Sequence, residues 1–292
     1  MKYALFLGCK IPYFVPQYET SSRLVCDELG VELVDIEFNC CGYPVHHLDF
    51  DSFLLASGRN LALAEQKGLN ITTPCKCCYS SLKKVDHLLK EQESLRDKVN
   101  GTLQAEGLKY EGRIEVKHML QVFYHDVGVD TIKKKVTNPF KGLKIATHYG
   151  CHVLRPSNIM EFDDPAQPRK FDELVEATGA TSVDWQMKLQ CCGNPLWGKN
   201  DDLSKDLTEA KLVSGKQAGA NYLCVACTYC QIQFDTVQKM IVDEKGQDYA
   251  LPSILYPQLL GLSIGIQGKK LGLDMSRLGT GTLSLFLSSR AA

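Results

Sequence analysis

The chain has 292 residues, of which 44% are hydrophobic and 23% are charged, and its formal net charge is −1. This composition is ordinary for a globular protein, and the length suffices for two domains that each have a core of their own. Because the net charge is close to zero, it gives no argument for binding to nucleic acid or to an anionic membrane surface.

The first half of the chain predicts alternating strands and helices. The apolar N-terminal segment is better interpreted as a strand than as a cleavable signal, because it leads directly into Gly8-Cys9-Lys10. Gly30 and Gly68 mark helix ends, and an acidic cap is expected at Asp51. In chain order we expect strand 2–7, helix 19–29, strand 31–36, helix 51–67, strand 70–73 and helix 80–90.

The next segment, residues 91–140, has no counterpart of equal length later in the chain. It is charged at first and then carries an apolar run over residues 119–123. We expect it to cover or to connect the two halves.

The second half repeats the alternation. We expect strand 143–148, helix 171–177, strand 181–184, helix 204–218, strand 222–225 and helix 229–241. The apolar stretch 251–266 contains two prolines and is shorter than the roughly 20 apolar residues of a membrane-spanning helix. We therefore expect a cytoplasmic protein without a membrane span. Residues 275–292 fit none of the expected elements.

Ten of the thirteen cysteines form two copies of one pattern, which is a lone Cys, an adjacent pair and a C-x-x-C. The lone cysteines are 142 residues apart, the pairs 151 and the C-x-x-C elements 152. Such a nearly constant offset indicates an internal duplication. The first copy comprises Cys9, Cys40, Cys41, Cys75 and Cys78, and the second comprises Cys151, Cys191, Cys192, Cys227 and Cys230.

The predicted fold class is α/β, with two pseudo-symmetric, Rossmann-like β-α-β-α-β halves. We place the first cysteine-rich domain, with the insert, at residues 1–142 and the second at residues 143–292. Ligands bind outside the carboxyl ends of the strands in open parallel sheets. Every cysteine element follows an expected strand, so five thiols should converge on one sheet edge in each half.

Five thiols exceed the four ligands of a structural zinc site. Neighbouring residues in an extended segment point in opposite directions, so an adjacent Cys pair suits two irons of a larger cluster better than one zinc ion. The pattern therefore favours an iron–sulfur cluster in each half over zinc, since soft thiolates select either one. The glycine after each pair serves as a turn residue or lets backbone N–H groups approach cluster sulfides.

Three cysteines stand outside the pattern. We interpret Cys26 as a buried inert thiol and Cys77 as a spare thiol near the first cluster. Cys224 forms an overlapping C-x-x-C with Cys227, so Cys224 and Cys230 both remain candidate ligands, although the alignment of the two halves favours Cys230.

Four histidines lie close to the cysteines in sequence and could donate to a sulfide or deliver a proton. His152 is the strongest candidate, ahead of His46, His47 and His148.

At these residues the sequence resembles the catalytic B subunit of heterodisulfide reductase, which belongs to a family with a duplicated cysteine-rich domain known as CCG. Cys40-Cys41-Gly42 and Cys191-Cys192-Gly193 carry the hallmark. The resemblance covers nearly the whole chain and includes the stretches 7–12, 74–82, 149–156, 162–165 and 256–262. The gaps between pair and C-x-x-C, of 33 and 34 residues, are slightly shorter than is usual in the family.

The resemblance implies that each half binds a non-cubane 4Fe–4S cluster through its five cysteines. Such a protein reduces the mixed disulfide of coenzyme M and coenzyme B to two thiols, in one-electron steps at the two clusters. The cluster irons themselves would be catalytic, with His152 as a candidate helper. Implied partners are the ferredoxin-like C subunit and the flavin-containing A subunit of heterodisulfide reductase, joined in electron-bifurcating assemblies by a hydrogenase or formate dehydrogenase.

Two other functions compete with this one. In lactate, glycolate or glycerol-phosphate dehydrogenases, a related iron–sulfur protein only relays electrons, although two complete motifs argue against that role. A zinc-stabilised binding module without redox activity is the second alternative.

Overall fold

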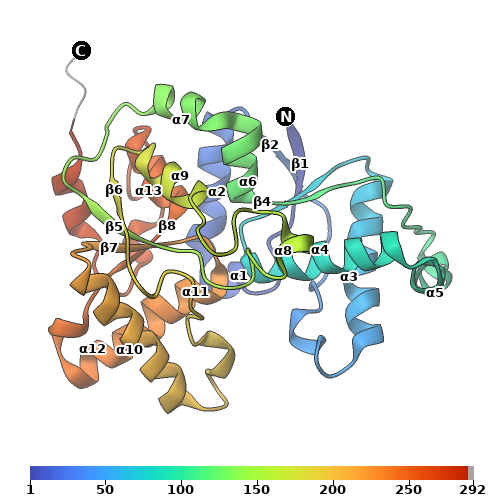
Figure 1. The fold of residues 1–292 in the computed structure, drawn as a ribbon. Helices are drawn as coiled ribbons and strands as arrows, with labels where there is room; N and C mark the ends of the chain where they lie inside the picture. The colour runs from blue at the N-terminus through green and yellow to red at the C-terminus, as the bar shows by residue number, and fades with distance from the viewer. Residues whose placement is uncertain (289–292) are drawn as a thin grey trace.

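The computed structural model describes residues 1–288, which form two four-stranded parallel sheets (Figure 1). The strand orders are β2-β1-β3-β4 and β6-β5-β7-β8, so the second sheet repeats the first. This arrangement confirms the expected α/β class with two similar halves.

The first half follows the predicted order, with helices that begin earlier than expected. The Asp49 side chain accepts a hydrogen bond of 3.1 Å from the Ser52 N–H, so Asp49 rather than Asp51 is the helix cap. The elements are β1 (Lys2–Leu5), α1 (Ile11–Phe14), α2 (Pro16–Glu28), β2 (Glu32–Val34), α3 (Phe50–Gln66), β3 (Ile71–Thr73), α4 (Lys76–Glu91), α5 (Glu93–Leu103), β4 (Val116–His118), α6 (Met119–Gln121) and α7 (Val129–Lys135).

The second half has the same succession. Asn200 caps α10 by accepting a 3.1 Å hydrogen bond from the Leu203 N–H, so this helix also begins before the expected residue. The elements are β5 (Lys144–His148), α8 (Ser157–Met160), α9 (Lys170–Glu176), β6 (Thr181–Val183), α10 (Asp201–Gln217), β7 (Tyr222–Val225), α11 (Thr228–Ile232), α12 (Gln238–Lys245), β8 (Ser253–Leu255) and α13 (Tyr256–Ser263).

Short helical turns connect these elements. Two are π-helical, η3 (Val122–Gly128) and η5 (Gln233–Val237). The 3₁₀ turns are η1 (Tyr43–Val45), η2 (Gln104–Glu106), η4 (Asn194–Leu196), η6 (Gln247–Tyr249), η7 (Leu273–Met275) and η8 (Gly281–Phe286).

Each sheet has a fourth strand that the sequence patterns did not predict. β4 lies within the insert and pairs with β3, while β8 pairs with β7. The insert therefore has a counterpart, because its β4-α6 segment corresponds to β8-α13. Each of these strands is only three residues long, and neither is followed by a cysteine element of the kind that marks the equally short strands β2, β3 and β6.

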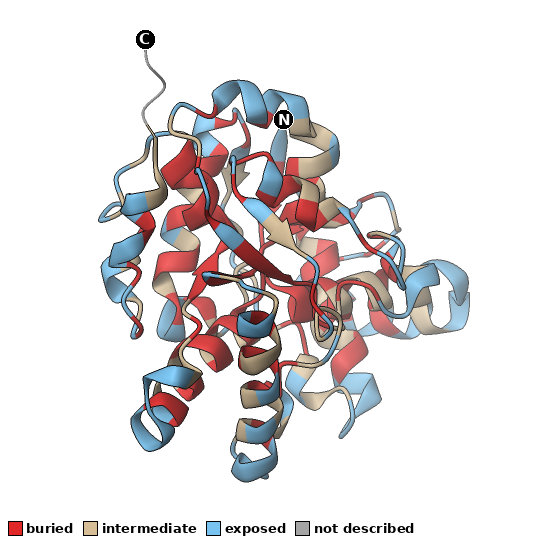
Figure 2. Cartoon of the chain, turned by 60° about the vertical axis from the view of Figure 1, so that its left-hand side comes forward, coloured by how far each residue is buried: buried red, intermediate tan, exposed pale blue. Residues whose placement is uncertain are grey.

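The two halves exchange the helices that follow their fourth strands. Helix α13 packs against α2 of the first half, and η3 packs against α9 of the second half (Figure 1). The Tyr124 hydroxyl donates to the Glu173 carboxylate at 2.7 Å, and the rings of Phe123 and Tyr256 lie 5.9 Å apart. Buried residues consequently run through both halves as one core (Figure 2). The boundary at 142/143 stays a prediction.

The C-terminal segment folds back onto the second half. The Arg277 N–H donates to Asp235 at 2.8 Å, Leu283 is buried, and Leu287 forms an antiparallel bridge with Phe140. The unassigned stretch 275–292 thus covers the core up to residue 288, and residues 289–292 lie outside the described part of the chain.

Candidate metal centre

The thiols gather where the parallel strands end. Cys75 immediately precedes α4 and Cys227 immediately precedes α11, so both follow the central strands β3 and β7. Cys9 and Cys151 follow the neighbouring strands β1 and β5. The adjacent pairs lie in the loops after the edge strands β2 and β6.

Two adjoining cavities lie against these residues. One is lined by the five cysteines of the first copy, which we call the first thiol group, and the other by the five of the second copy, the second thiol group. Cys77, Tyr43 and Tyr229 line both cavities. The structure therefore brings all ten predicted cysteines together in two sets of five that share a wall.

Contacts between sulfur atoms repeat from one group to the other. In the first group the Sγ atoms of Cys9 and Cys40 are 3.9 Å apart, and those of Cys41 and Cys78 are 3.6 Å apart. The second group pairs its cysteines in the equivalent way, Cys151 with Cys191 and Cys192 with Cys230.

Cys224 and Cys230, the two overlapping candidate ligands, occupy different positions. Cys230 lies against Cys192 and lines the second cavity. Cys224 is buried within β7, and burial raises the pKa of its thiol, as for an inert core cysteine. Cys26 is likewise buried, and its pKa is raised to about 12 by burial.

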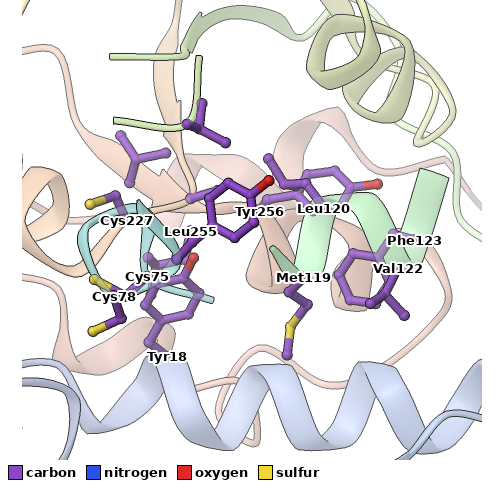
Figure 3. Close-up of a cluster of buried hydrophobic side chains, with 14 of the residues drawn as sticks. Tyr18, Cys75, Cys78, Met119, Leu120, Val122, Phe123, Cys227, Leu255 and Tyr256 are labelled. Carbon is purple, nitrogen blue, oxygen red and sulfur yellow. The ribbon is translucent and has the colours of Figure 1, made fainter. Parts of the chain in front are cut away.

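The two thiol groups meet at the centre of the molecule. The Sγ atoms of Cys75, Cys77 and Cys227 all lie within 4.8 Å of one another, and Cys227 belongs to the other half. Figure 3 shows Cys75 and Cys227 approaching each other above Tyr18. Cys77 thus lies between both groups, and its interpretation as a spare thiol stays a prediction. The spacing of the cysteines along the sequence could not predict this contact, because it joins residues of different halves.

The glycine after each adjacent pair combines two roles. Gly42 and Gly193 have φ values of +78° and +93°, which side chains rarely adopt. Their N–H groups also donate to the sulfur of Cys40 and Cys191, and the pKa of each thiol is lowered to about 2. For Cys40 the largest cause is the hydrogen bond with Cys41, and for Cys191 the one with Cys151.

Among the candidate histidines, His152 faces the thiols most directly. Its ring lines the second cavity and packs edge-on against Tyr43 at 5.3 Å. Within residues 1–288 its Nδ1 has no hydrogen-bond partner, and burial lowers its pKa. His46 and His47 stack on each other at 4.4 Å near Lys84, and His148 is enclosed at the end of β5.

His118 is a central residue that the sequence patterns did not indicate. Its Nε2 lies 3.1 Å from the Pro74 carbonyl oxygen and 3.2 Å from that of Ala226, the residues directly before Cys75 and Cys227. It thus joins the two cysteine-bearing loops. Burial lowers the pKa of this imidazole to about 3, so it is neutral.

The donor set fits an iron–sulfur centre. All thirteen cysteines are free, each cavity is lined by five thiols, and backbone N–H groups point at the sulfur atoms. Such soft donors select zinc or iron–sulfur clusters, and five of them exceed the four that a zinc site uses.

Comparison with known proteins agrees with this chemistry. The family described as "Cysteine-rich domain" (CCG) matches residues 3–83 and 145–235, one match in each half. The chain belongs to the cysteine-rich domain family. Both matches contain a complete thiol group, so the duplication that the cysteine spacing indicates coincides with the two family domains.

Two relatives align with almost the whole chain. The B subunit of the ferredoxin/F(420)H(2)-dependent CoB-CoM heterodisulfide reductase of Methanosarcina acetivorans is 36% identical over 282 residues, which are 95% of this chain and 94% of that protein. The "8-methylmenaquinol:fumarate reductase membrane anchor subunit" of Wolinella succinogenes is 31% identical, and the match covers 95% of this chain and 99% of that one. The first of these matches confirms the resemblance to the B subunit of heterodisulfide reductase.

A solved structure shares the fold. The crystal structure of a hypothetical protein from Helicobacter pylori has a TM-score of 0.76 and 18% sequence identity, and the match covers 96% of this chain. This chain spans about half of that one, 52% of its length. Within the described residues, every helix is too short or too polar to cross a membrane.

Proposed function

We propose that this chain is the catalytic subunit of a heterodisulfide reductase that reduces the disulfide of coenzyme M and coenzyme B to two thiols. The observation that carries the proposal is the pair of adjoining cavities, each lined by five thiols and sharing Cys77 as a wall. Similarity to a heterodisulfide reductase over 95% of the chain supports it.

The ligands that we propose are the two thiol groups, Cys9, Cys40, Cys41, Cys75 and Cys78 for one non-cubane 4Fe–4S cluster and Cys151, Cys191, Cys192, Cys227 and Cys230 for the other. Two such clusters would supply one electron each, which matches the two electrons that a disulfide takes up.

The chain itself contributes an enclosed and oriented site between the thiol groups. Tyr43 and Tyr229 pack edge-on at 5.5 Å and line both cavities. Gly42 and Gly193 hold the adjacent pairs in place through their N–H···S contacts. The substrate S–S bond would lie beside this wall, where each sulfur faces one thiol group.

His152 is the residue that we propose to assist the release of the products. Its free Nδ1 and its place on the cavity wall let the imidazole hydrogen-bond to a departing sulfur. The two protons that complete the two thiols come ultimately from solvent.

The chain would work as a cytoplasmic part of a larger assembly. Its sequence has neither a flavin-binding motif nor the four-cysteine run of a ferredoxin. We therefore propose that a ferredoxin-like C subunit and a flavin-containing A subunit deliver electrons, joined in bifurcating assemblies by a hydrogenase or formate dehydrogenase.

A turnover assay on anaerobically purified protein tests this function. With a reduced viologen as electron donor, the protein should release two thiols from each heterodisulfide and consume two electrons. An electron-relay protein, the alternative role given by the lactate, glycolate or glycerol-phosphate dehydrogenases, would accept electrons from the dye and release no thiols. That result, with both clusters present, would reject the proposed catalytic role.

A further inference from the structure

Two buried lysines lie near the second thiol group. Lys76 belongs to the first C-x-x-C, yet its side chain reaches across to the second half and lines the second cavity. Its Nζ donates to the carbonyl oxygens of His148 at 2.8 Å and Tyr149 at 2.9 Å. These carbonyls lie at the end of β5, just before Cys151.

Lys211 is the second of these lysines and belongs to helix α10. It is fully buried, its Nζ donates to the Met187 carbonyl oxygen, and it lies 5.0 Å from the centre of the Trp185 ring. Burial lowers the pKa of this ammonium to about 8, and the charges that oppose the shift come from Cys192, Cys230, Cys191 and Cys151. For Lys76, the opposing charges come from Cys230, Cys227, Cys224 and Cys151. All of these cysteines belong to the second half.

The internal duplication provides a comparison within the molecule. The offset of 151 residues between the pairs equates Lys211 with Asn60, and the offset of 152 between the C-x-x-C elements equates Lys76 with Thr228. Asn60 is neutral and donates to the carbonyl oxygens of Asn39, Cys40 and Ala56. At both equivalent positions, therefore, the first thiol group has an uncharged side chain.

Other nearby charges do not cancel the difference in buried positive charge between the two thiol groups. Lys10 lines the first cavity, but it is partly exposed, so solvent and salt screen its charge. The buried carboxylate near the second group, Asp172, forms an ion pair of 2.7 Å with Lys188. His148 lies between Lys76 and Lys211 and is neutral, because burial and the charges of both lysines lower its pKa.

We infer that the cluster held by the second thiol group has a higher reduction potential than the cluster held by the first. Reduction adds negative charge to a cluster, and a buried cation close by stabilises the reduced form more than an exposed one does. Lys76 and Lys211 act through their positive charges and do not themselves bind the cluster. A single electron available to both clusters would therefore reside on the cluster of the second half. This inference rests on the proposed pair of iron–sulfur clusters.

A redox titration followed by electron paramagnetic resonance tests the order of potentials in the unmodified protein. Two centres should titrate at different potentials. Cys192→Ala should remove the centre of higher potential, and Cys41→Ala should remove the centre of lower potential. A single shared potential, or loss of the higher centre in Cys41→Ala, would overturn the inference.

Lysine variants then test the cause. Lys76→Met or Lys211→Met should lower the potential of the higher centre so that its oxidised-to-reduced ratio at a fixed applied potential rises about tenfold, which is about 59 mV for a one-electron couple. The other centre should not move. Lys216→Met removes the same charge from an exposed position on α10 and should shift neither centre.

Iron content measured on each variant separates a shifted potential from a lost cluster. Lys211→Arg keeps the charge and should retain the native potential, which a purely structural role would not require. Unchanged potentials in Lys76→Met and Lys211→Met, with full iron content, would overturn the role of the lysines. If the heterodisulfide is not reduced while the potentials split as described, the catalytic proposal fails and the inference stands.

Discussion

The glycine of each Cys-Cys-Gly motif shows how one residue meets a structural and a chemical demand together. A Cβ atom on Gly193 would lie 2.7 Å from the Ser204 carbonyl oxygen, closer than real contacts allow. The same residue directs its N–H to the Cys191 sulfur. The interpretation as a turn residue therefore applies to Gly193, and the approach of backbone N–H groups to cluster sulfides stays a prediction.

Replacing Gly193 tests the steric demand. Gly193→Ala should destabilise the protein by the left-handed strain of about 1–2 kcal/mol and by about 1–3 kcal/mol more for the overlap with Ser204. Gly68→Ala is the matched control, because Gly68 has φ +64° and nothing within 4 Å of the added Cβ. Urea unfolding should show a clearly larger loss for Gly193→Ala, and equal losses would contradict the steric argument.

The thiol groups make a second prediction at this scale. Cys41→Ala or Cys192→Ala should lose one cluster and abolish disulfide reduction, because each removes a thiol from one cavity. Cys26→Ser should keep both clusters, since Cys26 lies in α2 away from both cavities. Iron content and thiol release measure the two effects. Unchanged iron in the first two variants would refute the ligand assignment.

At the scale of elements, the sequence predicted the first three strands of each half and the main helices between them. The strands β2, β3 and β6 are as short as β4 and β8, but a cysteine element follows each of the first three and marks its end. The eleven-residue helix α5 was also missed, because its segment is charged and shows little apolar periodicity. The sequence patterns also could not show that α13 packs on α2 and η3 on α9, since periodicity identifies an apolar face but not its partner.

The exchanged helices should couple the halves energetically. Phe123 is fully buried in η3 against Tyr256, which begins α13. Phe123→Ala should cost about 3–5 kcal/mol through the cavity it leaves. Denaturant unfolding should remain a single transition, moved to lower concentration as a whole. Tyr13→Ala, at a side chain that is 83% exposed, should change stability by no more than about 0.5 kcal/mol. Two separate transitions in Phe123→Ala would contradict a shared core.

At the scale of the whole molecule, the cysteine offsets indicated the duplication and the membership of each thiol group. The meeting of the groups at Cys77 and the bridge made by His118 had no such signal, because both depend on how the halves face each other. The asymmetry of Lys76 and Lys211 becomes visible only when equivalent positions of the two halves are compared in space. The duplication therefore explains why the halves share a fold and a set of five thiols. The differences between the halves place the buried lysines near the second thiol group alone.

The two thiol groups should hold two four-iron clusters. Iron, zinc and acid-labile sulfide should be measured per chain on protein purified without oxygen. We predict about 8 iron atoms with an equal amount of sulfide. Zinc bound without sulfide would contradict the account, because it would leave the duplicated thiols without a redox centre.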